Sequence, residues 1–378
     1  MTRRRILIVA PGFPAQSDEP GLASVADLVE RLAAHNDVRV IALRHPQGHS
    51  DFTFAGARVT SLGFGRAGGA IGRFRVVGAG VRAVVRAQRD SPIDLIHALW
   101  ADEPGAVAVT AGRLIRRPAI VSLMGGELVA FPDIGYGAAL GRGGRITTRV
   151  ALRGAAAITA GSSYARDLAL ARIAATRLTL APLGVDTELF KPGPEDHERR
   201  PPSILFVGSL EPVKDPFLML RSFADVAAQG SEARLVVAGD GRLRDELESE
   251  TERRGISDRV SFRGQVPRDQ MPALYRSASV LCVTSRHEAQ SMAAVEAAAC
   301  GLPIVGTRVG VLPDLGAAAL IVPGTESELS KALLRVLDEP TRARMSAAAR
   351  EVAERDYEIG LTSARLERLY EEVLRRPR

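Results

Sequence analysis

The feature that most constrains the fold is a continuous apolar run that ends at a loop and occurs twice. The opening RRRILIVAPG contains the run Ile6–Ala10, and PPSILFVGSL in the middle of the chain contains the run Ser203–Val207. Such runs are typical of parallel strands buried on both faces. In both halves a helical pattern and further apolar runs follow. The sequence therefore predicts two Rossmann-like α/β domains, each built on a parallel sheet.

The expected elements follow this order in each half. In the first half we expect a helix over Leu22–Ala34 and strands over Val38–Leu43, Asp94–Leu99, Ala119–Leu123 and near Ala156–Thr159. In the second half we expect a helix over Pro216–Ala228 and strands over Leu235–Ala238, Val260–Phe262, Val280–Val283 and Pro303–Val305. The chain from Glu326 onward is expected to be helical.

Domain boundaries are expected where composition changes. The segment KPGPEDHERRPP, residues 191–202, is rich in proline and charge, which is typical of a linker. We expect a first domain over 1–190 and a second over 203–355. A C-terminal helix over 356–378 is expected to pack back toward the first domain. The 378 residues suit two domains at about 150 residues each.

Charge and composition limit the partners. The formal net charge of +6 favours anionic partners such as nucleotides, phosphates or acidic lipid. Aromatic residues make up 4% of the chain, fewer than expected for stacking bases, so we expect no nucleic-acid partner. Two cysteines form no disulfide or metal pattern, and the apolar run after the first arginines is short for a signal peptide. These features predict a cytoplasmic protein.

Two arginine series have helical spacing. Arg75, Arg82, Arg86 and Arg89 form one, and Arg142, Arg145, Arg149 and Arg153 form the other. Either series is a solvated helix face, or the protein makes a peripheral contact with an anionic membrane at its inner face.

Two glutamates stand eight positions apart around an expected helix start. The segment TSRHEAQSMAAVEAAACGLPIV contains Glu288 and Glu296, with Ser291 as the expected N-cap. It follows the strand Val280–Val283, and ligands of open parallel sheets bind beyond the carboxyl ends of the strands. Free N–H groups at a helix start suit phosphate, and a carboxylate further along can bind a ribose diol. The spacing fits a nucleotide-sugar, although two surface glutamates on an alanine-rich helix are the plainer alternative.

Several segments resemble, in the same order, the motifs of one family. The glutamate pair resembles the E-x7-E element of retaining glycosyltransferases of family 4, which have the GT-B architecture. The resemblance extends to APLGVDTELFKP (Ala181–Pro192), VGSLEPVKDP (Val207–Pro216), VAGDGRLRDEL (Val237–Leu247), FRGQVP (Phe262–Pro267) and MPALYRSASVL (Met271–Leu281). It covers the second half almost completely, and the first half mainly in organisation.

The resemblance implies a donor site in the second domain. Lys214 stands where the family's lysine contacts the donor diphosphate, and Glu288 where a glutamate lies near the donor sugar; these two are the expected catalytic residues. Glu296 corresponds to the ribose-binding glutamate. Further donor contacts are implied for Gly208, Ser209, Gly264, Val266, Ala289, Gln290 and Ser291.

Two departures from the family pattern concern this donor site. The family's arginine directly after the glycine is Ser209 here, so Arg242 and Arg286 are candidates for the missing charge. The family's Gly-Phe-Gly is replaced by Ala-Gln-Ser at residues 289–291, which bears on donor preference. No Asp-x-Asp motif occurs, and we expect a metal-independent reaction without a cofactor.

The first domain offers weaker candidates. Gly12 and Gly21 flank the loop after the first strand, which can approach the donor. His97 either lines the acceptor pocket or is a core histidine. VSLMGGEL resembles the family's T-x-H-G-x-D/E loop, with Met124 in place of the histidine and Glu127 at the acidic position.

The resemblance implies an enzyme that transfers a sugar from a UDP- or GDP-sugar to an acceptor hydroxyl with retention. The acceptor is expected to be a carbohydrate or a lipid-linked molecule. The alternatives are an epimerase or phosphorylase of the same fold and a non-catalytic relative.

Overall fold

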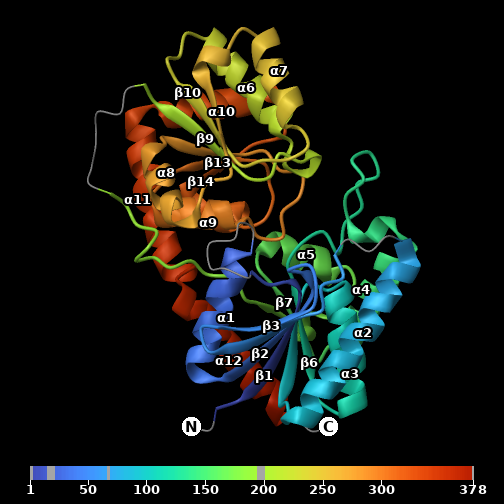
Figure 1. Ribbon diagram of the computed structural model, residues 1–378. Coiled ribbons are helices and arrows are strands. Elements are labelled where there is room, and N and C mark those ends of the chain that lie inside the picture. Colours follow the sequence, from blue (N-terminus) through green and yellow to red (C-terminus); the bar gives the residue numbers. More distant parts are fainter. Residues whose placement is uncertain (1–2, 15–21, 66–68, 194–200, 377–378) are drawn as a thin grey trace. The chain divides into compact units, whose positions relative to one another are not determined.

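The computed structural model describes residues 3–14, 22–65, 69–193 and 201–376 (Figure 1). The chain forms two compact units. The first comprises the residues up to Leu183 together with those from Ile359 onward, and the second comprises Gly184–Glu358. Most of the predicted linker over 191–202 lies outside the described residues, and the division between the units falls earlier, within the segment Ala181–Pro192.

An eight-stranded sheet forms the first unit, with the strand order β3-β4-β2-β1-β5-β6-β7-β8. All neighbouring strands are parallel except β3 and β4. The strands are β1 (Arg5–Gly12), β2 (Asp37–His45), β3 (Ser50–Phe54), β4 (Ala57–Ser61), β5 (Leu95–Leu99), β6 (Ala119–Leu123), β7 (Ala157–Ala160) and β8 (Leu178–Leu180).

Helices cover both faces of this sheet. Figure 1 shows α2 and α3 on one face and α1 and α12 on the other. The helices are α1 (Ala23–His35), α2 (Gly69–Asp90), α3 (Glu103–Ile115), α4 (Arg142–Gly154), α5 (Ser163–Leu170) and α12 (Ile359–Arg375). Because α12 belongs to this unit, the end of the chain completes the domain that its beginning starts.

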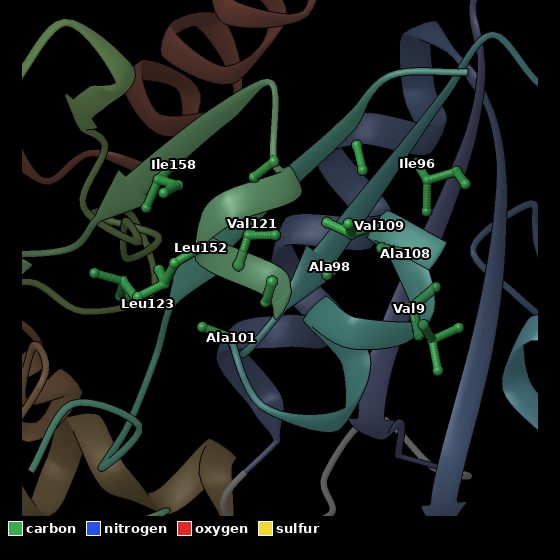
Figure 2. Packing of buried hydrophobic residues seen from close by; sticks show 14 of the residues in the cluster. Val9, Ile96, Ala98, Ala101, Ala108, Val109, Val121, Leu123, Leu152 and Ile158 are labelled. Atoms are coloured by element: carbon green, nitrogen blue, oxygen red, sulfur yellow. The ribbon is translucent and has the colours of Figure 1, made fainter. Parts of the chain in front are cut away.

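The core of the first unit explains the continuous apolar runs. Val9, Ala98 and Val121, from neighbouring strands, are fully buried against α3 and α4 (Figure 2). Ile6–Ala10 lies between β2 and β5, where both faces of the strand are covered. A strand without a solvent face has no position that favours a polar residue, so its sequence does not alternate.

The second unit contains a six-stranded, all-parallel sheet in the order β11-β10-β9-β12-β13-β14. Its strands are β9 (Ser203–Val207), β10 (Arg234–Ala238), β11 (Val260–Gly264), β12 (Val280–Val283), β13 (Ile304–Gly306) and β14 (Ala319–Ile321). Its helices are α6 (Pro216–Ala228), α7 (Arg244–Arg253), α8 (Met271–Ser277), α9 (Met292–Ala299), α10 (Glu326–Leu337) and α11 (Glu339–Asp356).

The predicted fold class is confirmed, and the unpredicted strands are short or lie at the sheet edges. β3 and β4 form an antiparallel hairpin, in which exposed positions alternate with half-buried ones along β3 and buried positions alternate with exposed or half-buried ones along β4. β8 and β14 have three residues each, too few to show a period. Among the described residues, no helix is both long and apolar enough to cross a membrane.

Candidate functional site

Three strands of the second sheet end in glycines whose backbones pack directly on one another. Gly208 follows β9, Gly239 follows β10 and Gly264 ends β11. The N–H of Gly239 donates a hydrogen bond to the Gly264 carbonyl at 2.7 Å. A Cβ on Gly239 would lie 1.9 Å from the Gly208 carbonyl oxygen, and its φ of +134° also favours glycine. This part of the carboxyl edge is therefore built from main chain, with the predicted donor residues Gly208 and Gly264 on either side of Gly239.

Lys214 and Glu288, the two predicted catalytic residues, face each other at the same edge. Lys214 ends the short 3-10 turn Pro212–Lys214 after β9, and Glu288 lies in the loop after β12. The Lys214 Nζ lies 2.5 Å from Glu288 Oε1, which also accepts a hydrogen bond from Ser285 Oγ at 2.7 Å. The two side chains are 24% and 13% exposed. They form a partly buried ion pair that solvent still reaches.

The loop that carries Glu288 is fixed on both sides by hydroxyl groups. Thr284 Oγ1 donates to the Lys214 carbonyl at 2.8 Å, which ties the loop to the lysine's own turn. On the other side, Thr307 Oγ1 donates to the Ser285 carbonyl at 2.6 Å. Thr284 and Thr307 directly follow the neighbouring strands β12 and β13. The sheet register therefore sets the position of the ion pair.

The helix after this loop begins where the sequence predicted. α9 starts at Met292 with Ser291 as its N-cap residue, but the Ser291 side chain makes no capping hydrogen bond. Ser291 instead adopts a left-handed backbone, with φ +75°. Ala289 and Gln290, which precede it, are buried. A Cβ on Gly310 would lie 2.3 Å from the Gln290 carbonyl oxygen, so a glycine supports this turn from behind.

Glu296, the predicted ribose ligand, lies in α9 and is half-buried. Its Oε2 accepts a hydrogen bond from the phenol of Tyr275 at 2.8 Å. Tyr275 comes from α8 and is fully buried. Tyr275 lies in the segment Met271–Leu281, which resembles a family motif, but its role could not be predicted. The sequence of a short helix does not show which side chain a tyrosine contacts.

The missing arginine of the family pattern has no single replacement. Ser209 is exposed and directly follows Gly208. Arg242 is also exposed, and its Nε lies 3.0 Å from Glu211 Oε2. Arg286 is half-buried in the loop after β12, where its backbone N–H donates to the Val213 carbonyl at 2.8 Å. Both candidate arginines thus come from loops at the carboxyl edge of this sheet.

Val266 and Gly264 border the opposite end of this edge. Both are half-buried, and Gly264 has φ +65°, which places it in the left-handed region. Nearby, the Arg244 guanidinium lies over the Phe262 ring, 5.8 Å from its centroid. These two predicted donor contacts therefore lie at the end of β11 and just after it, near a stacked arginine.

In the first unit, Gly12 is required by close packing. It ends β1, and a Cβ there would lie 2.9 Å from the Cβ of His45. The neighbouring Phe13 N–H donates to the His45 carbonyl at 3.1 Å. Gly21 lies outside the described residues.

His97 is a core histidine, so the expectation that it lines an acceptor pocket is not supported. Its side chain is fully buried in β5. Nδ1 lies 2.8 Å from the Tyr370 hydroxyl and Nε2 lies 2.8 Å from Ser122 Oγ, which in turn lies 2.6 Å from Thr159 Oγ1. Burial lowers the pKa of His97 to about 4. The histidine is thus neutral at physiological pH, and both of its nitrogens are engaged within the core.

Glu127 is buried and supports the loop after β6. It accepts three backbone N–H groups, those of Ala101 at 3.1 Å, Met124 at 3.0 Å and Gly125 at 2.8 Å. Its oxygens therefore serve the main chain of this loop. Met124 is half-buried directly after β6. That Met124 and Glu127 line an acceptor or sugar pocket stays a prediction.

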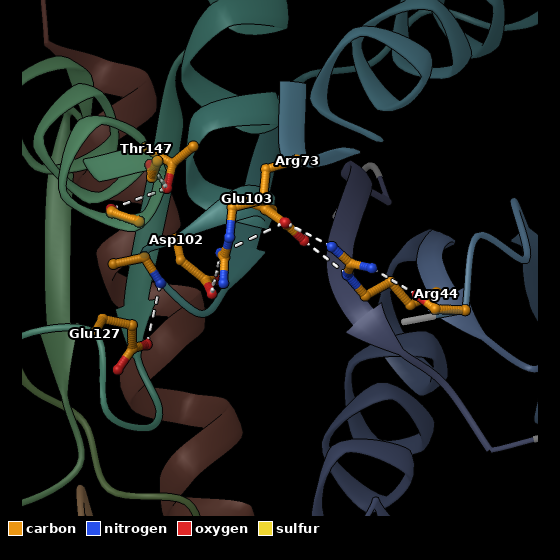
Figure 3. Close-up of polar contacts among 10 residues, drawn as sticks. Arg44, Arg73, Asp102, Glu103, Glu127 and Thr147 are labelled. Carbon is orange, nitrogen blue, oxygen red and sulfur yellow. Dashed lines mark hydrogen bonds and ion pairs between the residues drawn. The ribbon is translucent and has the colours of Figure 1, made fainter. Parts of the chain in front are cut away.

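A charged cluster at the carboxyl edge of the first sheet was not predicted from the sequence. Figure 3 shows Arg44 and Arg73 converging on Glu103, with Asp102 beside it. Arg44 donates to both oxygens of Glu103 at 2.6 and 2.8 Å, and Arg73 lies 3.5 Å from Glu103 and 3.9 Å from Asp102. Burial, with the charges of Glu127 and Glu103, raises the pKa of Asp102 to about 7. The dipeptide Asp102-Glu103 directly after β5 was the available signal.

The two units therefore share one plan, a parallel sheet whose carboxyl edge carries the polar residues. The same plan occurs in solved structures over nearly the whole chain. HepE of Anabaena, solved with UDP and glucose, has a TM-score of 0.75 at 20% identity and covers 98% of this chain and 100% of its own. Sucrose-phosphate synthase from Thermosynechococcus elongatus has a TM-score of 0.79 at 21% identity and covers 98% of this chain and 99% of its own. These TM-scores, over nearly the whole length of both chains, establish the GT-B fold.

Sequence comparisons identify the family. Residues 22–184 match the family described as "Glycosyl transferase 4-like domain", and residues 189–352 match "Glycosyl transferases group 1". Together the two matches span most of the chain. The chain belongs to the group 1 glycosyltransferases, as the motifs of the second half predicted.

Curated relatives match over part of their length. D-inositol 3-phosphate glycosyltransferase from Kribbella flavida is 36% identical over 192 residues, which cover 45% of this chain and 45% of that protein. 2-deoxystreptamine glucosyltransferase from Streptomyces kanamyceticus is 29% identical over 286 residues, which cover 69% of this chain and 73% of that protein. The match thus spans less than half of the first relative.

Proposed function

We propose that this protein is a retaining glycosyltransferase that moves a hexosyl unit from a UDP- or GDP-sugar to an acceptor hydroxyl. Family membership supports sugar transfer. The relatives bear the names of a glycosyltransferase and a glucosyltransferase, and HepE was solved with UDP and glucose. The donor would bind at the carboxyl edge of the second sheet.

The observation that carries the proposal is the ion pair between Lys214 and Glu288. The ammonium group is already held at the sheet edge by a carboxylate 2.5 Å away. An incoming diphosphate would replace Glu288 as the partner of Lys214, and the released carboxylate could then accept hydrogen bonds from sugar hydroxyls. As the glycosidic bond breaks, the charge that develops on the leaving diphosphate would face a preorganised cation.

The start of α9 supplies the rest of the proposed donor contacts. The main-chain groups at Ala289, Gln290 and Ser291 precede a helix whose first N–H groups suit phosphate. Glu296, about one turn into the helix, would accept hydrogen bonds from the ribose diol. This assigns the phosphates to the helix start and the nucleoside to its side.

Retention follows from a front-face scheme in which the leaving phosphate takes the proton of the acceptor hydroxyl. That scheme needs no strong protein base, and it fits a site in which Lys214 is the cation beside the diphosphate. We propose that the reaction is independent of metal ions for the same reason, with Lys214 and the helix start compensating the charge.

The acceptor is proposed to be a carbohydrate or a lipid-linked molecule, reached at a membrane surface. α4 exposes four arginines together with Ile146, and α2 exposes four arginines together with Phe74. Basic side chains beside apolar ones suit peripheral contact with anionic lipid. The exposed arginines are Arg75, Arg82, Arg86 and Arg89 in α2, and Arg142, Arg145, Arg149 and Arg153 in α4. This supports a cytoplasmic enzyme at the inner membrane face.

The test screens nucleotide-sugars by thermal shift and then measures release of the nucleoside diphosphate. We expect Lys214→Ala to lower kcat about 10²- to 10³-fold, because it removes the cation at the leaving group. Glu296→Ala should mainly weaken donor binding. Lys331→Ala is the matched control, since Lys331 forms an exposed ion pair with Glu328 at 3.0 Å on α10.

Three outcomes would contradict parts of the proposal. Unchanged donor affinity and turnover in both site variants would refute the site. Consumption of the nucleotide-sugar without transfer would indicate an epimerase or a phosphorylase. Failure to release nucleotide from any donor would indicate a non-catalytic relative.

A further inference from the structure

Tyr275 is a fully buried residue whose hydroxyl bonds to Glu296, a predicted ligand-binding residue of the second unit. Its hydroxyl lies 2.8 Å from Glu296 Oε2, while Glu296 itself is half-buried. The phenol thus bonds the carboxylate from the interior of the unit. A glutamate on a helix has several rotatable bonds, and a single fixed oxygen removes much of that freedom.

The tyrosine ring is held in place by its own packing. It lies 6.1 Å from the Phe190 ring, centroid to centroid, with an interplanar angle of 59°. Phe190 is also fully buried, and the Arg268 guanidinium lies 5.7 Å from its centroid. The packing of Phe190 thus helps to hold the tyrosine ring in place.

The chemistry of the bond has one direction. Burial and the neighbouring Glu296 carboxylate raise the pKa of Tyr275 well above its usual value of 10. The phenol therefore keeps its proton and acts as the donor, and Glu296 Oε2 is the acceptor. A carboxylate offers about four acceptor positions, and the bond from the phenol occupies one of those of Oε2.

We propose that Tyr275 is a positioning residue that orients Glu296 for the 2′- and 3′-hydroxyls of the donor nucleoside. The inference rests on the proposed function and makes it more specific. It assigns the recognition of a ribonucleotide over a deoxyribonucleotide to the Tyr275–Glu296 pair. Without the phenol, Glu296 would keep its charge but lose the orientation that lets it bind a diol.

The experiment measures discrimination by calorimetry. The dissociation constants of UDP, GDP and their 2′-deoxy counterparts are determined, and the pair with the tighter ribonucleotide is used. For the wild type we expect the deoxynucleotide to bind about 10-fold more weakly or worse, because a hydrogen bond to a charged group is lost. Glu296→Ala should bring the ratio of the two dissociation constants, deoxynucleotide over ribonucleotide, close to 1. Tyr275→Phe should lower it about 3- to 10-fold, and in turnover it should raise KM more than it lowers kcat.

The matched control is Tyr370→Phe. Tyr370 is also fully buried and its hydroxyl also has a side-chain partner, but that partner is His97 in the first unit. Both variants lose one buried hydroxyl, so a general loss of stability should affect both. Only Tyr275→Phe should change the ribose ratio. If Tyr275→Phe does not fold, Phe190→Leu loosens the same ring and should lower the ratio by a smaller factor.

The outcomes separate this inference from the proposed function. A wild-type ratio near 1, or no binding of either nucleotide, refutes the assignment of Glu296 and with it this inference. A clear wild-type ratio that Glu296→Ala abolishes and Tyr275→Phe leaves unchanged overturns the role of Tyr275 alone. If only Phe190→Leu can be measured, an unchanged ratio has the same meaning.

Discussion

The carboxyl edges of the two sheets use charge in opposite ways. In the second unit, Lys214 and Glu288 form one ion pair that solvent reaches, among glycine turns. In the first unit, Glu103 and Glu127 are buried, and their oxygens serve arginines or backbone N–H groups. The same architecture thus carries an ion pair that solvent reaches at one edge and buried carboxylates bonded within the protein at the other. Charged residues at a sheet edge indicate a binding site only when their partners can be exchanged.

Asp102 gives the largest expected effect on this comparison. Its pKa is raised to about 7 in the fold, above the usual 3.8, so stability is fully present at low pH and is lost as the pH rises toward 7. Asp102→Asn cannot ionise. Relative to the wild type, its free energy of unfolding should therefore improve by about 2–3 kcal/mol between pH 5 and pH 8.

Urea unfolding at the two pH values measures this difference. Asp167→Asn is the control, because Asp167 is exposed on α5 and should show no such change. A variant that gains nothing at pH 8 would show that burial and the neighbouring carboxylates do not raise the pKa of Asp102.

Glu127→Gln tests whether the first edge is held by its own hydrogen bonds. The amide would place an N–H group against a backbone donor and should cost about 1–3 kcal/mol of unfolding free energy. The measurement is made at pH 5, where Asp102 is largely protonated and repulsion does not mask the loss. Glu328→Gln, at an exposed helical position, should change stability by no more than about 0.5 kcal/mol. Equal effects of the two variants would refute the structural role of Glu127.

Ser291→Gly is expected to give the smallest effect, and it concerns the carboxyl edge of the second sheet. Ser291 has φ +75° and makes no capping hydrogen bond, so glycine should stabilise the second unit by about 0.5–1 kcal/mol. Ser291→Ala keeps the strained backbone and should be nearly neutral. Denaturant midpoints distinguish the two, and a destabilising glycine would show that the serine side chain has an unrecognised partner.

The sequence predicted more of the second unit than of the first because of how each site is built. Lys214 and Glu288 stand in loops directly after strands, and a parallel sheet brings such loops together. His97 could not be assigned from the sequence, because its partner Tyr370 is contributed by the last helix, far along the chain. Glu127 kept its acidic position in the motif, but its three N–H partners depend on the path of the loop.

The close stack of Gly208, Gly239 and Gly264 limits how such a protein can diverge. A methyl group at Gly239 would collide with the neighbouring strand end. A larger residue at this position would therefore require the strands to separate. We therefore expect changes in donor preference to arise in the side chains around these three glycines. This chain departs from its family pattern at Ser209 and at residues 289–291, which lie in loops at the same carboxyl edge.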